Sequence, residues 1–140
     1  MKLKDIMTKE VEVIDPKSSL KDAAQKMRIR DIGFLPVYDG DQILGVVTDR
    51  DIIVRSTAEG TDPDTSLGRD FITTPAVSCF DDQDVEEAAR LMEEHQIRRV
   101  IVLSRDDNRL VGVVSLGDIA RSSAQKTSAE VLQSVSEPTN

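Results

Sequence analysis

Two stretches of the chain contain residue types that could bind a small ligand. They read Gly45-Val46-Val47-Thr48-Asp49-Arg50-Asp51 and Gly112-Val113-Val114-Ser115-Leu116-Gly117-Asp118. In both, a glycine precedes two apolar residues, a hydroxyl residue, two variable positions and an aspartate. Because an apolar run ends at each hydroxyl residue, we expect this Gly-x-x-Thr/Ser-x-x-Asp motif to lie where a strand passes into a helix.

One interpretation of the motif needs no ligand. Thr48 or Ser115 would cap the following helix, and Asp51 or Asp118, three residues later, would complete a capping box. An aspartate in the first turn also interacts favourably with the helix dipole. Capping explains the hydroxyl and the carboxylate, but it does not require the glycine.

A second interpretation is a ligand pocket. Backbone N–H groups at a helix N-terminus suit a phosphate, and a hydroxyl there can donate to it. A carboxylate one turn later can accept both hydroxyls of a ribose, and a glycine on the incoming strand lets a flat base approach the backbone. The whole motif occurs twice, which favours the pocket, although the capping box stays open as the alternative.

The motifs belong to a longer internal repeat. Lys4–Thr8 aligns with Arg69–Thr73, 65 residues later, and Gly45–Val47 aligns with Gly112–Val114, 67 residues later. The two extra residues fall between Leu103 and Leu110, in a polar stretch typical of a turn. Insertions confined to turns are how structural repeats diverge.

Each repeat contains the elements needed to position its motif. A helical stripe of apolar residues spaced i, i+3, i+4 and i+7 occurs in both copies, behind candidate N-caps Ser19 and Asp84. The stripe residues are Leu20, Ala23, Ala24 and Met27, then Val85, Ala88, Ala89 and Met92. In the first copy, Asp39-Gly40 between two apolar runs predicts a hairpin, because both residues tolerate positive φ. A second short helix is expected from about 50 to 56 and from 117 to about 122.

The expected order in each repeat is therefore strand, helix, strand, strand, helix, which makes the fold class α/β (α+β). We expect repeat 1 over residues 1–58, a linker over 59–66, repeat 2 over 67–122 and a partly ordered tail over 123–140. A copy of about 60 residues buries little surface alone. We therefore expect the repeats to pack sheet against sheet as one pseudo-two-fold unit.

Composition excludes several classes of function. Lys and Arg number 18 against 26 Asp and Glu, for a formal net charge of -8, which disfavours nucleic-acid binding. No apolar run approaches the roughly 20 residues of a membrane helix, and the first residues do not resemble a signal peptide. Cys79 is the single cysteine and His95 the single histidine, which favours a reducing compartment and leaves little for a metal site. The sequence predicts a cytoplasmic protein.

With both motifs in place, the chain resembles the CBS-domain family over residues 1–122, in the tandem arrangement called a Bateman module. Residues 129–138 also resemble the tails of small stand-alone bacterial CBS-pair proteins. The resemblance implies binding of AMP, ADP or ATP, less often of S-adenosylmethionine or dinucleotides, in two clefts between the repeats. It also implies a homodimer that signals to a protein effector, which the sequence does not identify.

The resemblance also assigns roles to residues. Asp51 and Asp118 would hold ribose, Thr48 and Ser115 would face ribose or phosphate, and backbone segments of both repeats would line the base. The implied nucleotide-binding set is Ile14, Pro16, Leu35, Pro36, Gly45, Thr48, Asp51, Cys79, Arg98, Arg99, Val100, Gly112, Ser115 and Asp118. Arg98-Arg99 matches a basic pair that reaches phosphate in the family, whereas the first repeat has Gly33-Phe34 there. A solvated strand edge or an ion pair would equally explain the two arginines.

Three classes of function follow from this sequence. A regulatory module would sense adenosine nucleotides and respond by conformational or oligomeric change. A protein-interaction or stress-associated protein would have clefts that do not bind nucleotides. An enzyme is not expected, because no nucleophile, base and metal set forms a constellation. We therefore expect no catalytic residue, no metal and no required cofactor.

Overall fold

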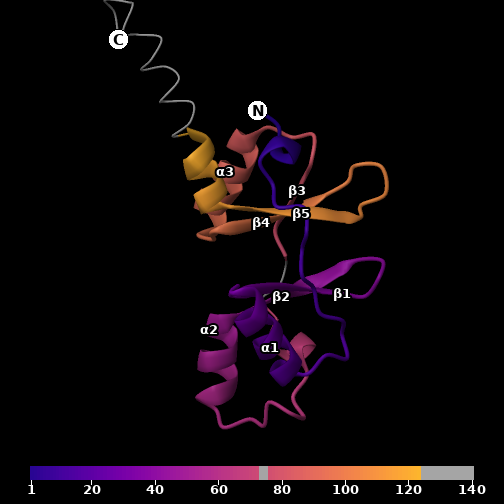
Figure 1. Cartoon of the computed structure of the whole chain (residues 1–140), viewed down its shortest axis with the longest axis vertical. Coiled ribbons are helices and arrows are strands. Elements are labelled where there is room, and N and C mark those ends of the chain that lie inside the picture. Colours follow the sequence, from indigo (N-terminus) through magenta and orange to yellow (C-terminus); the bar gives the residue numbers. More distant parts are fainter. Residues whose placement is uncertain (73–75, 124–140) are drawn as a thin grey trace, which may run out of the picture. The chain divides into compact units, whose positions relative to one another are not determined.

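The computed structural model describes residues 1–72 and 76–123. The chain divides into two compact units, each assembled from separate segments. One unit comprises Glu10–Val77 and Asp106–Leu110, and we call it the β1–β2 unit. The other comprises Met1–Lys9, Ser78–Arg105 and the chain from Val111 onward, and we call it the β3–β5 unit (Figure 1).

The described residues of the β1–β2 unit form one antiparallel pair of strands and four helical elements. In chain order its elements are α1 (Leu20–Arg30), β1 (Phe34–Tyr38), β2 (Ile43–Thr48), α2 (Asp49–Asp51), the π-helical η2 (Ile52–Thr57) and the 3₁₀ turn η3 (Gly68–Phe71). Val37 of β1 lies opposite Gly45 of β2, next to a bulge at Val37/Tyr38. The second short helix predicted for this repeat is thus present as α2 and η2 without a break.

The strand expected at the start of repeat 1 is reduced to a single bridge. Ile14 pairs in parallel with Val37. Its N–H donates to the Pro36 carbonyl (3.0 Å), and its own carbonyl accepts the Tyr38 N–H (2.9 Å). In the second repeat the aligned residue, Cys79, belongs to a three-residue strand.

Helix α1 begins and ends as local chemistry dictates. The Ser19 hydroxyl accepts the Asp22 N–H (3.0 Å), and the Asp22 carboxylate accepts the Ser19 N–H (3.3 Å), which confirms Ser19 as the N-cap. The helix ends at Asp31, which has a left-handed φ of 54°. Gln96, at the aligned position after the corresponding helix of the second repeat, also has φ 54°. The two repeats therefore have the same left-handed backbone conformation at the end of the long helix.

The β1–β2 hairpin forms where Asp39-Gly40 predicts it, but only the glycine adopts positive φ, at +100°. Asp39 contributes through its side chain instead: its Oδ1 accepts the N–H groups of Asp41 and Gln42, both at 2.9 Å. These bonds lower the pKa of the Asp39 carboxyl, because they stabilise its charged form. The predicted hairpin is confirmed, and an aspartate that bonds backbone N–H groups two and three residues ahead explains the turn without positive φ at Asp39.

The β3–β5 unit contains a three-stranded sheet in the order β3-β4-β5. Its elements are the 3₁₀ turn η1 (Leu3–Asp5), β3 (Ser78–Phe80), α3 (Val85–His95), β4 (Arg99–Leu103), β5 (Leu110–Ser115) and a helix over residues 116–123. Strands β3 and β4 run parallel, with Cys79 opposite Val102. The turn between β4 and β5 lies where the two-residue insertion was predicted.

The N-terminal segment of the chain is part of the β3–β5 unit. The Thr8 N–H donates to the Val113 carbonyl (2.9 Å), and the Val113 N–H donates to the Thr8 carbonyl (3.0 Å). The Met1 carbonyl accepts the Val85 N–H at the start of α3 (3.0 Å). Asp84 is the N-cap residue, as predicted, but its side chain makes no capping bond and pairs with Lys2 (3.2 Å). The neighbouring segment of chain therefore contributes the cap that the sequence assigned to Asp84.

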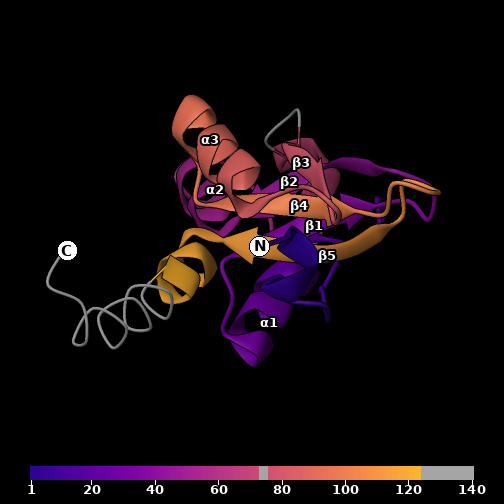
Figure 2. The same cartoon turned by 90° about the horizontal axis from the view of Figure 1, so that it is seen from above.

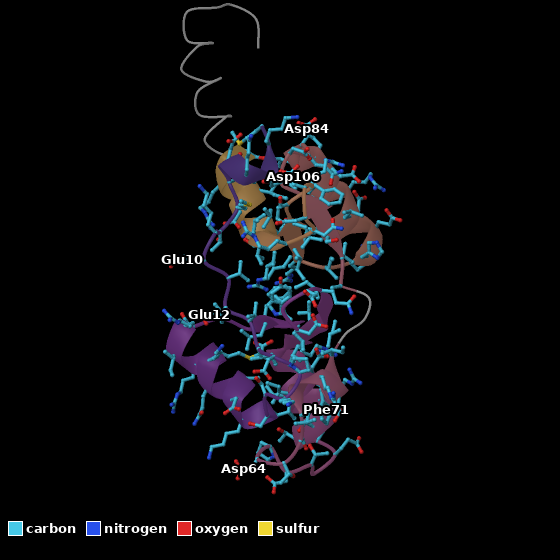
Figure 3. All side chains as sticks on the ribbon, turned by 90° about the vertical axis from the view of Figure 1, so that its right-hand side faces the viewer. Glu10, Glu12, Asp64, Phe71, Asp84 and Asp106 are labelled. Carbon is cyan, nitrogen blue, oxygen red and sulfur yellow. The ribbon has the colours of Figure 1, made fainter. Side chains whose placement is uncertain are left out.

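The segment that leads into repeat 2 is likewise part of the β1–β2 unit. Leu67 forms a bridge with Ser19, and the Arg55 guanidinium donates to the carbonyls of Phe71 (3.2 Å) and Ile72 (3.3 Å). Figure 3 labels Phe71 among the side chains of the chain. With the repeats taken as residues 1–58 and 67–122, each unit thus contains the first segment of the other repeat.

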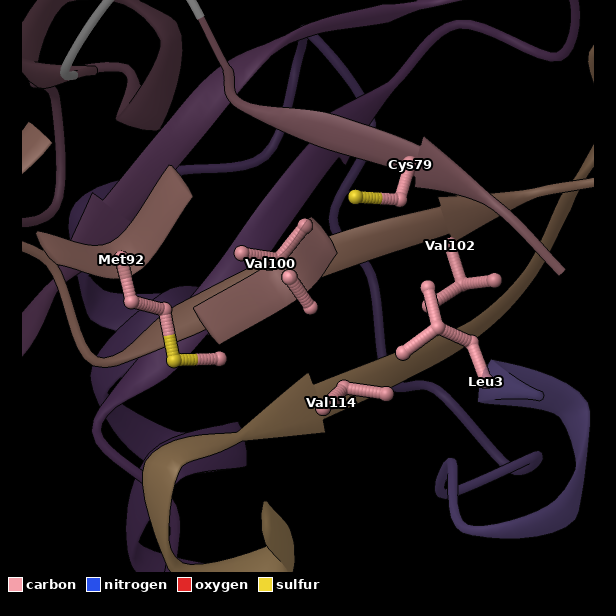
Figure 4. Close-up of a cluster of buried hydrophobic side chains, with 7 residues drawn as sticks. Leu3, Cys79, Met92, Val100, Val102 and Val114 are labelled. Atoms are coloured by element: carbon pink, nitrogen blue, oxygen red, sulfur yellow. The ribbon is translucent and has the colours of Figure 1, made fainter. Parts of the chain in front are cut away.

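Each unit has its own hydrophobic cluster. In the β3–β5 unit, α3 packs beside β4 (Figure 2), and the cluster draws on the sheet, α3 and η1 (Figure 4). Its buried members are Leu3, Cys79, Ala88, Met92, Val100, Val102 and Val114. The cluster of the β1–β2 unit contains Ile14, Ala23, Met27, Leu35, Val37 and Val47. Alternate strand residues and the predicted helical stripes supply both clusters.

Candidate ligand-binding site

The first motif spans the end of β2 and the start of α2. The Asp51 N–H donates to Thr48 Oγ1 (3.1 Å), and the Thr48 N–H donates to Asp51 Oδ2 (3.0 Å). Both residues are half-buried. The capping box that the sequence predicts is therefore formed in the β1–β2 unit.

The second motif forms the same box at the end of β5. The Asp118 N–H donates to Ser115 Oγ (3.0 Å), and the Ser115 N–H donates to Asp118 Oδ2 (2.9 Å). Asp118 Oδ1 additionally accepts a bond from the guanidinium of Arg121. The hydroxyl and carboxylate of each motif are thus held in place by the backbone, at a helix N-terminus where ribose and phosphate groups would be recognised.

A backbone bond ties each helix start to the residue before the neighbouring strand. The Asp49 N–H donates to the Gly33 carbonyl (2.9 Å), and the Leu116 N–H donates to the Arg98 carbonyl (2.7 Å). Gly33 and Arg98, which are aligned in sequence, therefore occupy equivalent positions in their own units. The second bond also places the backbone of Arg98 beside the helix start that follows Ser115, and Arg98 and Arg99 are both exposed.

The absence of a side chain at Gly33 has a local reason. A Cβ at that position would lie 2.6 Å from Asp49 Oδ2. The carboxylate of Asp49 therefore occupies the side of Gly33 that a larger residue would need. The residue of the second motif that aligns with Asp49 is Leu116, which carries no charge.

The motif glycine of the β3–β5 unit also has a packing role. A Cβ on Gly112 would lie 2.6 Å from the Met7 sulfur and 2.9 Å from the Thr8 carbonyl oxygen. The N-terminal segment thus lies directly against this glycine. Gly45, its counterpart, is buried opposite Val37. Close approach of protein backbone is sufficient to require Gly112, whether or not a base also approaches it.

The residues implied as nucleotide-binding fall in two groups. Ile14, Pro16, Leu35, Pro36, Gly45, Thr48 and Asp51 lie in the β1–β2 unit, and Cys79, Arg98, Arg99, Val100, Gly112, Ser115 and Asp118 lie in the β3–β5 unit. Ile14, Leu35, Pro36, Cys79 and Val100 are buried, and none of these residues exposes more than 3% of its surface. Their expected part in lining a base stays a prediction.

The remaining chemistry-bearing side chains do not assemble into a reactive group. Burial raises the pKa of the Cys79 thiol to about 11, which makes it a poor nucleophile at neutral pH. His95 is exposed at the end of α3, as the sequence indicated. Within residues 1–72 and 76–123, no three His, Cys, Asp or Glu side chains are placed to hold a metal ion. None of the helices described there is long and apolar enough to cross a bilayer.

Two residues at these sites were missed at the level of sequence. Asp49 was treated as a variable position of the motif, and Arg121 was not considered. Asp49 is charged, whereas its aligned residue in the second repeat, Leu116, is not. Likewise Arg121 is charged, whereas its aligned residue in the first repeat, Val54, is not. A comparison of charges between aligned positions would have found them.

The fold and the paired motifs define a tandem-repeat protein with the same capped strand-to-helix junction in each repeat. The CBS domain family model matches residues 3–57 and again residues 68–125. The protein therefore belongs to the CBS-domain family, with two CBS repeats.

Known proteins of similar size share this architecture. The chain is 38% identical over 127 residues to the CBS domain-containing protein YhcV of Bacillus subtilis (strain 168), covering 91% of this chain and 89% of YhcV. It is 36% identical over 136 residues to Hypoxic response protein 1 of Mycobacterium tuberculosis, covering 96% and 94%. The CBS domain pair of protein MJ0100, in complex with 5-methylthioadenosine and S-adenosyl-L-methionine, matches with a TM-score of 0.78 at 26% identity, covering 90% of this chain and 98% of that chain.

Proposed function

We propose that this protein is a regulatory module that binds adenosine nucleotides (AMP, ADP or ATP) at its two motifs and signals by a change of conformation or oligomeric state. In this proposal it is a cytoplasmic homodimer that acts on a protein effector and catalyses no reaction. Asp51 and Asp118 hold ribose, Thr48 and Ser115 face ribose or phosphate, and Arg98 and Arg99 reach phosphate.

The observation that carries the proposal is the doubled junction of strand and helix. In each repeat a hydroxyl and a carboxylate are fixed by reciprocal bonds of 2.9 to 3.1 Å to the first turn of a helix. Prearranged polar groups lose little entropy when they bind a ligand, which favours affinity. The complex of MJ0100 supports an adenosine compound, because 5-methylthioadenosine and S-adenosyl-L-methionine both contain an adenosyl group.

A contact at the far end of the helix supports signalling. The helical stretch of α2 and η2, which begins at the Thr48 box, includes Arg55, whose guanidinium donates to the carbonyls of Phe71 and Ile72. A shift of this helix on ligand binding would therefore be felt by the segment that leads into repeat 2. The ligand can drive such a shift only if it binds the two conformations with different affinity.

The test is isothermal titration of the purified chain with AMP, ADP and ATP. Saturable heat at one or two sites per chain is expected, together with a raised melting temperature. A ligand at 100 times its Kd stabilises the folded state by about 2.7 kcal/mol. Absence of heat with every adenosine nucleotide would overturn the proposal and leave the motifs as capping boxes.

Variants of the two aspartates sharpen the test. Asp118→Ala should weaken nucleotide binding more than Asp51→Ala, because only the second repeat has the Arg98-Arg99 pair. Equal losses in calorimetry would contradict this inequality. Asn variants at both positions control for loss of the cap, because an amide oxygen can still accept the backbone bond of the cap.

A further inference from the structure

Three exposed arginines gather around one motif of a protein whose net charge is -8. Arg98 and Arg99 lie beside the helix start through the Leu116–Arg98 backbone bond, and Arg121 follows one turn into the helix. The aligned residues of the first repeat are Gly33, Phe34 and Val54, none of which is charged. These three positions are therefore charged in the second repeat alone, whereas the first motif has an arginine of its own, Arg50, where the second has Gly117.

Arg121 differs from the other two arginines because it binds the carboxylate of the motif itself. Asp118 Oδ2 accepts the Ser115 N–H, and Asp118 Oδ1 accepts a bond from the Arg121 guanidinium. The Asp118 side chain is only 12% exposed, whereas that of Arg121 is 71% exposed. The carboxylate is thus fixed, and its partner is a long side chain free to swing in solvent.

This pair would be easy for a ligand to separate. Ion pairs with so exposed a partner contribute little to stability, because water solvates the released charge. Two ribose hydroxyls that donate to Asp118 would replace the bonds lost from Arg121. The released guanidinium would remain within one helical turn, and its planar set of donors suits phosphate oxygens.

We propose that Arg121 is the residue that makes the second motif select phosphorylated nucleotides over nucleosides. The inference rests on the proposed function and deepens it by naming the ligand class of one site. Ribose displaces Arg121 from Asp118, and the guanidinium then joins Arg98 and Arg99 in holding the phosphate chain. At the first motif Val54 takes the place of Arg121, and the carboxylate of Asp49 lies beside Gly33, so Asp51 has no arginine three residues later that ribose could displace.

The experiment compares adenosine with AMP and ATP by titration calorimetry, at low and at moderate salt, on the wild-type protein and on Arg121→Gln. Both proteins are also measured with Asp51→Asn, so that binding at the second motif dominates the heat. Arg90→Gln is the matched control, because Arg90 forms a similar exposed i,i+3 pair with Glu87 away from both motifs. Thermal unfolding confirms that every variant is folded.

The expected result is that Arg121→Gln lowers the ATP affinity about tenfold while adenosine affinity stays equal or rises, because nothing then competes for Asp118. The salt dependence of ATP binding should also weaken, since one phosphate contact is lost. Equal changes for adenosine and ATP, or no change, would overturn this inference while nucleotide binding by the wild type still stands. If the wild type binds no adenosine compound, the proposed function fails and this inference fails with it.

Discussion

In the β3–β5 unit a large residue, Leu3, and a small one, Cys79, belong to the same buried cluster. In the β1–β2 unit the aligned positions hold Gly68 and Ile14, so the small and the large residue have changed places. A Cβ on Gly68 would lie 2.7 Å from Ile14 Cδ1, which means that Ile14 fills the space Gly68 leaves. The larger side chain of the pair is therefore supplied by a different segment in each unit.

The exchange has a consequence for each unit. The N-terminal segment contributes a full apolar side chain to the β3–β5 unit, whereas the segment before repeat 2 contributes only backbone to the β1–β2 unit at the aligned position. The smaller partner in the β3–β5 unit is also a titratable thiol. Core packing, sensitivity to truncation and sensitivity to pH should accordingly differ between the units.

The largest effect is expected from Leu3→Ala. Leu3 is fully buried, so its truncation should lower the free energy of unfolding by about 2–5 kcal/mol, as lost burial and a cavity add together. Urea denaturation measures this change. Ile29→Ala is the control, since Ile29 is 70% exposed and should change stability by no more than about 0.5 kcal/mol. A similarly small effect of Leu3→Ala would mean that the N-terminal segment adds nothing to this core.

Alkaline pH should destabilise the β3–β5 unit through Cys79. Its pKa is raised to about 11 in the folded protein from 9.0, because burial disfavours the thiolate. The unfolded chain therefore releases this proton first. The protonated Cys79 thiol therefore makes its full contribution to the free energy of unfolding below pH 9. As the pH rises toward 11, this contribution is lost, by an amount on the order of 2–3 kcal/mol.

Cys79→Ala isolates this contribution. The free energy of unfolding of wild type and variant is measured by denaturation from pH 8 to pH 11. Above pH 9 the wild type should lose stability relative to Cys79→Ala. A difference that stays constant across the range would contradict the raised pKa. The first repeat offers no counterpart to this titration, because Ile14 stands at the aligned position.

Gly68→Ala tests the exchange of volume directly. The added methyl group meets Ile14 Cδ1, so the variant should lose about 1–3 kcal/mol of stability through overpacking. Ile14→Val removes that atom, and the double variant should be more stable than the sum of the two single losses predicts. Additive losses in urea denaturation would show that the two positions do not share space.

Gly33→Ala is the matched control for that experiment. Its Cβ would lie 2.6 Å from Asp49 Oδ2, a similarly short approach. Asp49 is exposed, however, and its carboxylate can turn toward solvent, whereas Ile14 is buried. Gly33→Ala should therefore cost less than Gly68→Ala.

Local sequence signals predicted much of the fold. The offset between repeats located the longer turn before β5, the apolar stripes identified α1 and α3, and Ser19 was correctly expected to cap α1. These features depend on residues close together in sequence. Family membership followed from the same residues, because both copies of the motif keep their spacing.

Features that depend on distant segments could not be predicted in this way. The cap of α3 comes from the Met1 carbonyl rather than from the Asp84 side chain, and Gly112 faces Met7 across the fold. The reduction of the first strand to one bridge at Ile14 also depends on its neighbours. At the candidate sites, spacing identified the hydroxyl and carboxylate pairs, but the bond between Arg121 and Asp118 required coordinates.

The smallest effect expected is also the one that separates capping from binding. Thr48→Ala and Ser115→Ala each remove one capping hydroxyl, with donor distances of 3.1 and 3.0 Å, so both should lower stability by about 1 kcal/mol. Capping alone makes the two repeats equivalent. Nucleotide affinity should instead fall more for Ser115→Ala, because only the second repeat has Arg98, Arg99 and Arg121 at these aligned positions. If the two variants instead differ in stability but lose the same nucleotide affinity, both expectations are contradicted. The repeats would then differ as structural elements rather than as binding sites.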